Sequence, residues 1–353
     1  MPLLLLGAGL LVLVAGAELL VRGASRLAAA LGIAPIVVGL TVVAYGTSSP
    51  ELAVSLLAAL NHQPDIALGN VIGSNIVNIL LILGVTAVAA PIAVTARLVR
   101  VDVPLMIAAS LLLLVLALDG RIGFVDGVVL LAGGAAYTSW LIAQRHLPTP
   151  EMLAAPSRPP VRWAGSVALA LVGLALLVLG ARWLVTGAVA VARLAGLSEL
   201  AIGLTIVAAG TSLPELATSV LASVRGERDI AVGNIIGSNI FNILVVLGAS
   251  GVVAGLDVPG PALRFDLPIM VVVAFAALPV FFTGARIGRR EGLMFLLYYI
   301  AYVLYLLLAS TRHDALPAFS AVMLWFALPL TFVTLGVLAW RWSRRSHGSQ
   351  AGP

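Results

Sequence analysis

The chain carries the same sequence twice, at an offset of 164 residues. Residues 69–79, GNVIGSNIVNI, match residues 233–243, GNIIGSNIFNI, and about two thirds of positions 39–84 are identical to their partners. An internal repeat of this length predicts two copies of one structural unit. Any fold proposed for the chain must therefore place two similar halves side by side.

Both copies are strongly apolar. The 353 residues are 61% hydrophobic and 10% charged, with a mean hydropathy of +1.13, whereas soluble domains are about 45 to 50% apolar. Runs of roughly 17 to 25 apolar residues are long enough to cross a bilayer as helices. We therefore expect an all-α integral membrane protein with eleven spanning helices, near residues 3–21, 34–60, 66–90, 103–118, 124–143, 163–185, 198–224, 230–254, 267–284, 292–309 and 317–341.

Each copy contains five of these helices. Because five is odd, the second copy enters the membrane from the opposite side, which predicts an inverted repeat with equivalent sites meeting near the midplane. The second, third, seventh and eighth helices are long or rich in Gly and Pro, which predicts discontinuous helices. The expected organisation is a first repeat over 1–143, a cytoplasmic linker over 144–162, a second repeat over 163–309, an extra helix over 317–341 and a tail over 342–353.

The distribution of arginine predicts the orientation. All 20 basic residues are arginine, and with the N-terminus outside, 15 of them lie in inside loops, where positive charge accumulates. The N-terminus lacks the features of a cleaved signal peptide, so the first apolar run is expected to remain as a helix. We expect a multi-pass protein of the cell's inner (plasma) membrane with a cytoplasmic C-terminus. The arginines do not gather on one face, so the expected partner is the lipid bilayer and not nucleic acid.

Two carboxylates lie in the middle of apolar runs, in the motifs GTSSPEL (46–52) and GTSLPEL (210–216). A charge at that depth costs about 2.5 to 3.5 kcal/mol on insertion scales, so Glu51 and Glu215 are expected to be functional. Pro50 and Pro214 cannot donate a backbone hydrogen bond and clash with the preceding turn. Each run should therefore break into two half-helices that leave carbonyl groups free beside the carboxylate.

Neutral oxygens accompany both carboxylates. Side chains three and four residues apart share a face of a helix, which brings hydroxyl and amide groups next to each Glu. Calcium takes 6 to 8 oxygen ligands, and two Glu balance a divalent charge, although sodium could use the same oxygens. The chain has no Cys, and none of its His lies within the expected spans. The spans therefore lack the ligands that softer metals prefer. The side chains expected at this site are Glu51, Glu215, Thr47, Thr211, Ser48, Ser212, Ser74, Ser238, Asn78 and Asn242.

Structural explanations compete for several polar residues. Ser and Thr in membrane helices often bond their own backbone or join helices. Glu18 precedes Arg22 by four residues, which favours a local ion pair. Asp102 and Asp266 stand before Val-Pro and Leu-Pro at helix starts, which favours N-caps. Four further asparagines near the glycines could satisfy backbone groups instead of binding ions: Asn70, Asn75, Asn234 and Asn239. Asp65 and Asp229 could cap the third and eighth helices or be charges of a vestibule, and the pattern favours caps.

The doubled motifs resemble the two alpha-repeats of the calcium/cation antiporter superfamily, and are most similar to the prokaryotic sodium/calcium exchangers. The resemblance covers residues 3–309 and implies that Glu51 and Glu215 bind calcium. It implies alternating access in which the first and sixth helices slide across a fixed core. It also implies that backbone carbonyls come from Thr47, Thr211, Ala44 and Ala208, and that sodium positions are lined by Ser48, Ser212, Ser74, Ser238, Asn78 and Asn242.

The chain departs from the superfamily pattern at two places. Potassium-dependent members carry an acidic residue in the second copy where this chain has Asn242, and Asn78 is likewise neutral. Both departures argue against potassium co-transport. The eleventh helix is additional to the ten that are usual in the superfamily.

Several functions compete on sequence alone. We expect a sodium/calcium antiporter that is not an enzyme and uses no cofactor, its transported ions being calcium and sodium. A proton/calcium antiporter is the alternative, because two Glu can also carry protons. A channel is less consistent with an inverted repeat. An intramembrane serine hydrolase built on Ser74 or Ser238 would lack a histidine base nearby, and a calcium sensor would bind calcium without transporting it.

Overall fold

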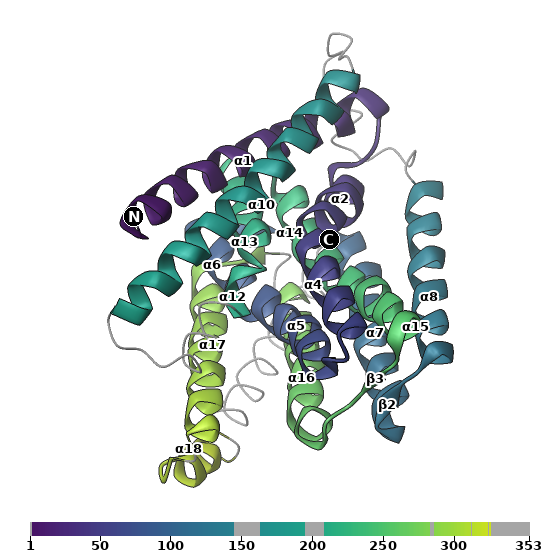
Figure 1. Cartoon of the computed structure of the whole chain (residues 1–353). Helices are drawn as coiled ribbons and strands as arrows, with labels where there is room; N and C mark the ends of the chain where they lie inside the picture. The colour runs from purple at the N-terminus through teal and green to yellow at the C-terminus, as the bar shows by residue number, and fades with distance from the viewer. Residues whose placement is uncertain are drawn as a thin grey trace, which may run out of the picture.

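The computed structural model describes residues 2–144, 163–194, 208–282, 286–311, 313–323 and 325. These described residues are helical almost throughout, which confirms the expected all-α membrane fold (Figure 1). The longer helices are α1 (Pro2–Leu31), α4 (Ser49–Leu60), α5 (Pro64–Val77), α7 (Val103–Leu116), α8 (Phe124–Ala143), α10 (Trp163–Leu194), α13 (Leu213–Val224), α14 (Arg228–Phe241), α16 (Leu267–Phe282) and α17 (Arg289–Ser310). Shorter helical elements are α2 (Pro35–Val38), η1 (Gly39–Val43), α3 (Ala44–Thr47), η2 (Asn78–Ile82), α6 (Leu83–Ala89), η3 (Leu98–Asp102), η4 (Ala117–Asp119), α12 (Ala208–Gly210), η6 (Asn242–Leu247), α15 (Gly248–Ala254), η7 (Ala262–Asp266) and α18 (Leu316–Val322).

Seven helices of the described part are long and apolar enough to cross a membrane, or eight if a bent pair is one span. Eleven were expected. The difference lies partly at the seventh and eleventh helices, because residues 195–207, 324 and 326–341 lie outside the described part of the chain. The linker expected over 144–162 falls almost entirely outside it as well. The eleventh helix is represented by α18 at its start.

The second helix breaks as the sequence predicted. The stretch from Pro35 to Thr47 meets α4 at a bend of 45°. Ser48 lies at the bend with φ −86° and ψ 8°, and Pro50 occupies the first turn of α4. Proline is tolerated there because backbone N–H groups in the first turn of a helix have no intrahelical acceptor, so proline loses no hydrogen bond.

The third and eighth helices are continuous, and the expectation that they are interrupted is wrong. Residues 64–89 form one span through α5, η2 and α6, and residues 228–254 form another through α14, η6 and α15. Their glycines weaken a helix but keep the backbone donor, and proline occurs only at the start, at Pro64. Instead of a break, each helix contains a π-helical stretch that begins at Asn78 or Asn242.

Burial places these two continuous helices at the centre of the molecule. The most apolar window of residues 228–254 is 94% buried, and that of residues 64–89 is 78% buried. The corresponding share is 33% for α1 and 11% for α17, whose exposed apolar side chains suit contact with lipid. The core is therefore built from equivalent helices of the two repeats.

Two short strand pairs tie loops of one repeat to loops of the other. Strand β1 (Ile92–Ala93) pairs with β4 (Arg286–Ile287), and β2 (Arg121–Ile122) pairs with β3 (Leu256–Asp257), both antiparallel. At the 164-residue offset β1 corresponds to β3. The two pairs are therefore related by the internal repeat, and each joins loops that the predicted topology places on the same side of the membrane.

Helices α1 and α10 lie side by side across one flank of the molecule (Figure 1). Glycines spaced seven residues apart line their contact. A Cβ added to Gly16 would lie 2.5 Å from the backbone nitrogen of Leu177, and one added to Gly23 would lie 2.6 Å from that of Ala170. Small residues at this spacing let two helix backbones approach closely. The glycines of this contact are Gly9, Gly16, Gly23, Gly173, Gly180 and Gly187.

Candidate cation site

The two helix starts at the half-helix breaks position the carboxylates. Glu51 lies in the first turn of α4 and Glu215 in the first turn of α13, and the two residues are 0% and 1% exposed. The N-terminus of a helix carries partial positive charge, which stabilises a carboxylate in the first turn. The local sequence, Pro followed directly by Glu, therefore sets both the break and the position of the charge.

Hydrogen bonds cross between the repeats at this point. Ser48 Oγ donates to Glu215 Oε1 at 2.8 Å, and Ser212 Oγ donates to Glu51 Oε1 at 3.2 Å. Ser212 Oγ also lies 3.2 Å from Ser74 Oγ. The serine of each copy thus donates a hydrogen bond to the carboxylate of the other copy. These contacts bring five of the predicted site residues together: Ser48, Glu51, Ser74, Ser212 and Glu215.

The threonines beside these serines make a second set of crossed contacts. Thr47 Oγ1 lies 3.0 Å from Asn234 Oδ1, and Thr211 Oγ1 lies 3.4 Å from Asn70 Oδ1. Thr47 also donates to the carbonyl of Ala44 at 3.4 Å. In the second copy the equivalent alanine, Ala208, is the first residue of α12. Both hydroxyls thus contact a side chain of the opposite repeat.

Several buried polar atoms of the site have no hydrogen-bond partner among the residues that the structure describes. Leaving such atoms unpaired costs about 1 to 3 kcal/mol each, so their concentration at one place indicates a ligand. Most are oxygens, as hard cations require. The unpaired atoms are Glu51 Oε2, Glu215 Oε2, Asn78 Oδ1 and Nδ2, Ser238 Oγ and Asn242 Oδ1.

The donor set suits a hard cation. Within the described ranges no three side chains of His, Cys, Asp or Glu gather closely enough to hold a metal ion. The site therefore offers two carboxylates surrounded by neutral oxygens. A divalent cation would be neutralised by the pair, while sodium could bind at the neutral positions.

Asn70 and Asn234 each hydrogen-bond the backbone of the nearby glutamate and a serine on the same helix as that glutamate. Asn70 Nδ2 donates to the Glu51 carbonyl at 3.1 Å and to Ser55 Oγ at 2.9 Å. Asn234 Nδ2 makes the equivalent contacts, at 3.4 Å to the Glu215 carbonyl and 2.9 Å to Ser219 Oγ. This agrees with the backbone-satisfying role considered for these asparagines. The sequence interpretation missed both serines, although each follows its Glu by four residues in either copy.

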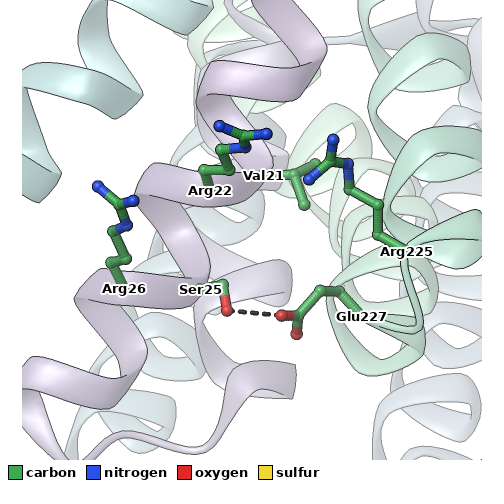
Figure 2. Close-up of a pocket in the computed structure, with 6 residues that line it drawn as sticks. All are labelled: Val21, Arg22, Ser25, Arg26, Arg225 and Glu227. Atoms are coloured by element: carbon green, nitrogen blue, oxygen red, sulfur yellow. Dashed lines mark hydrogen bonds between the residues drawn. The ribbon is translucent and has the colours of Figure 1, made fainter. Parts of the chain in front are cut away.

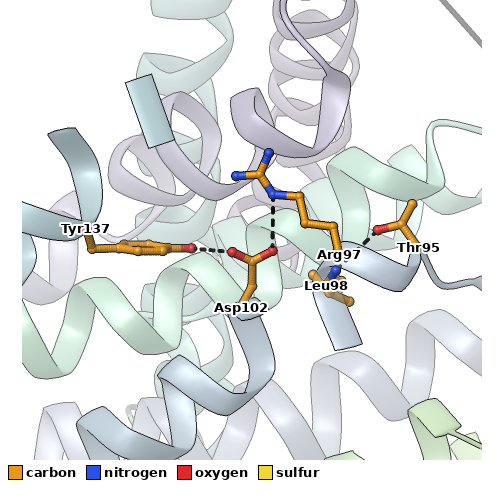
Figure 3. Close-up of polar contacts among 5 residues, drawn as sticks. All are labelled: Thr95, Arg97, Leu98, Asp102 and Tyr137. Atoms are coloured by element: carbon orange, nitrogen blue, oxygen red, sulfur yellow. Dashed lines mark hydrogen bonds and ion pairs between the residues drawn. The ribbon is translucent and has the colours of Figure 1, made fainter. Parts of the chain in front are cut away.

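Asp102 does not cap a helix, and that expectation is wrong. Its backbone is already helical at the end of η3, and its side chain makes no capping bond to α7. Figure 3 shows the carboxylate between two partners: Tyr137 donates to Oδ1 at 3.0 Å, and Arg97 Nε lies 3.8 Å from Oδ2. The fully buried charge is thus compensated by Tyr137 of α8 and by Arg97 at the start of its own helical segment. Asp266 likewise bonds a tyrosine, Tyr302.

Asp65 and Asp229 lie two residues beyond the N-cap positions of their helices. Both occupy the first turn of their helices, and the cap positions belong to Gln63 and Glu227. A carboxylate in the first turn still interacts favourably with the helix dipole. Their expected capping role is therefore replaced by a weaker electrostatic one.

The fold defines a multi-pass membrane protein of the transporter class, in which the two repeats meet at a pair of buried carboxylates. Comparison with known proteins agrees. A family model described as sodium/calcium exchanger protein matches residues 1–143 and 165–308. The chain therefore belongs to the sodium/calcium exchanger family and is a calcium/cation antiporter, as the doubled motifs indicated.

Individual relatives cover most of the chain. A putative antiporter, CaxA of Alkalimonas amylolytica, is 42% identical over 293 residues, which is 80% of this chain and 91% of that protein. The sodium/calcium exchanger MaX1 of Methanosarcina acetivorans is 32% identical over 318 residues, covering 79% and 91%. A solved structure of the sodium-calcium exchanger NCX_Mj superposes with a TM-score of 0.75 at 32% identity, covering 86% of this chain and 97% of that one.

Proposed function

We propose that this chain exchanges sodium for calcium by alternating access, with the ions bound between the two repeats near the bilayer midplane. The observation that carries the proposal is the pair of buried carboxylates, each bonded to a serine of the opposite repeat. Each also keeps one oxygen without a hydrogen-bond partner in the described part of the chain. The relative MaX1 is itself named a sodium/calcium exchanger. Its overall similarity to this chain supports sodium as the counter-ion.

The residues divide into three roles in this proposal. Glu51 and Glu215 bind calcium, because their combined charge balances a divalent ion. Backbone carbonyls of Thr47, Thr211, Ala44 and Ala208 complete its coordination. Neutral side chains hold sodium at flanking positions: Ser48, Ser212, Ser74, Ser238, Asn78 and Asn242.

Alternating access requires a moving part and a fixed part. The α1–α10 pair is the candidate moving part, because these helices contact each other through glycines and are much less buried than the central helices. The two continuous central spans are the candidate fixed part. We place the N-terminus outside and the C-terminus in the cytoplasm, in the inner membrane, with the two repeats bounded as the sequence predicts.

A proton/calcium antiporter is the competing function. The same two carboxylates could exchange protons for calcium, and their serine partners would remain compatible with a protonated acid. We expect neither enzymatic activity nor a cofactor. Ser74 lies against Ser212 and not against a base, which does not favour hydrolase chemistry.

A double variant, Ser48→Ala with Ser212→Ala, separates the two antiport functions. For sodium exchange we expect the sodium concentration that supports half-maximal calcium uptake to rise about tenfold or more, because each lost oxygen would have contacted a cation. Calcium binding should remain, because the charged pair is intact. Uptake by reconstituted vesicles is measured under a sodium gradient and then under a pH gradient.

Thr86→Val is the control for that experiment, because the Thr86 hydroxyl bonds the Ile82 carbonyl of its own helix at 2.6 Å. This control should match the wild type. Omitting potassium should change nothing in either protein, since Asn78 and Asn242 are neutral. Uptake that follows pH, ignores sodium and tolerates the double change would favour the proton antiporter.

A further inference from the structure

One face of α13 leads from the cation site to the surface. Glu215, Thr218, Ala222 and Arg225 follow one another at intervals of three, four and three residues, so they share a face of the helix. Helix α1 packs against α13, and Ala222 belongs to the same buried cluster as side chains of α1. We call this contact the α1–α13 seam, and the surface at its end the Arg225 face.

The seam ends in a small cavity bridged by polar contacts. Glu18 of α1 forms ion pairs with Arg22 and with Arg225, the first of which the sequence predicted. Ser25 Oγ donates to Glu227 at 2.7 Å, which joins α1 to the start of α14 (Figure 2). The cavity has a volume of about 190 Å³ and is lined by Val21, Arg22, Ser25, Arg26, Arg225 and Glu227.

Thr218 is the exceptional residue inside the seam. Its side chain is fully buried, yet Oγ1 has no hydrogen-bond partner among the described residues. Several other buried hydroxyls on helices, such as those of Thr86, Ser110 and Ser250, bond the carbonyl four residues earlier. Burying a hydroxyl without a partner is unfavourable, so valine would pack better at this position. A group that binds Thr218 at some stage of the transport cycle would explain the hydroxyl.

The residues of the α1–α13 seam differ from their counterparts in the other repeat. At the 164-residue offset, Thr218 corresponds to Val54, so the first repeat has the residue that packing alone would favour. The polar groups at the end of the seam are also replaced in their counterparts. Glu18, Ser25, Arg225 and Glu227 correspond to Arg182, Val189, Asn61 and Gln63.

We propose that the α1–α13 seam is the ion route between Glu215 and the Arg225 face, and that Thr218 Oγ1 binds the cation on this route. Thr218 lies about 4.5 Å further along the helix axis than Glu215, so an ion leaving the carboxylate would meet it next. The contacts of Glu18 with Arg225 and of Ser25 with Glu227 close the route at its end. The inference rests on the antiport proposed above.

The test is Thr218→Val, measured separately from the two faces of the membrane. Initial calcium uptake is recorded against calcium concentration in vesicles of each orientation. We expect the half-saturating calcium concentration to rise on the order of tenfold at the Arg225 face and to stay unchanged at the opposite face. The melting temperature of the variant should equal or exceed that of the wild type, because an unpaired hydroxyl is removed.

Thr86→Val, which removes a paired hydroxyl from a buried helix, should match the wild type at both faces. An unchanged half-saturating concentration in Thr218→Val at both faces would overturn the inference while leaving the antiport intact. An equal rise at both faces would also overturn it, because it would place Thr218 in the shared centre. A wild-type protein without calcium exchange would instead overturn the antiport on which the inference depends.

Discussion

Replacing Glu51 or Glu215 by Gln is expected to abolish calcium exchange while leaving the protein folded and inserted. Glutamine preserves the shape of the side chain and removes its charge. Leaving a buried charge with one partner fewer costs about 3 to 5 kcal/mol, which corresponds to about two to four orders of magnitude in calcium affinity. Because the two carboxylates are equivalent under the internal repeat, both single variants should lose a similar amount.

Calcium binding to the purified variants, measured with radioactive calcium, checks this prediction. Glu291→Gln is the matched control. Glu291 accepts a hydrogen bond from the Gly288 backbone at 3.0 Å, at the start of α17, and lies outside the site. Its variant should bind and exchange calcium as the wild type does. Near-normal exchange in either Glu51→Gln or Glu215→Gln would contradict the assignment of calcium binding to this pair of carboxylates.

Gly16→Ala is expected to lose most exchange activity through a purely steric effect. The added Cβ would lie 2.5 Å from the Leu177 nitrogen and 2.8 Å from the Gly173 carbonyl oxygen. Both are backbone atoms that cannot rotate away, so α1 and α10 must separate by about 1 Å to restore normal contact. Overpacking of this kind costs about 1 to 3 kcal/mol. If this energy destabilises only one of the two access states, the equilibrium between the two states shifts by roughly 5- to 150-fold.

Gly7→Ala is the control, because a Cβ at Gly7 meets nothing within 4 Å on the same helix. Exchange rates and melting temperatures of both variants are compared with those of the wild type. We expect Gly7→Ala to retain full activity. If Gly16→Ala exchanged calcium at the wild-type rate, the close α1–α10 contact would not matter for transport.

The repeat, the helix breaks and the two carboxylates could be predicted because each depends on local sequence. Pro50 and Pro214 act on their own segments, and Glu51 and Glu215 are conspicuous against an apolar background. The hydrogen bond between Ser48 and Glu215 could not be predicted from the sequence. Sequence spacing placed Ser48 beside the carboxylate of its own repeat, whereas the fold brings it to the carboxylate of the other.

Other features depend on long-range packing and could not be predicted. Asp102 lies just before a proline at a helix start, which is the pattern of a cap, but Tyr137 reaches it from α8, a different helix. Thr218 differs from Val54 in the sequence, but the sequence does not show that its hydroxyl is buried and has no hydrogen-bond partner among the described residues. The continuity of the third and eighth helices likewise follows from backbone hydrogen bonds that glycine retains.

Calcium uptake into vesicles that contain the purified protein tests the central claim most directly. The vesicles are loaded with sodium, with protons at low pH, or with neither, and diluted into the same calcium-containing medium. We predict rapid calcium uptake only into the sodium-loaded vesicles, and its loss when the sodium gradient is collapsed. Uptake into the acid-loaded vesicles that does not require sodium would contradict sodium/calcium exchange.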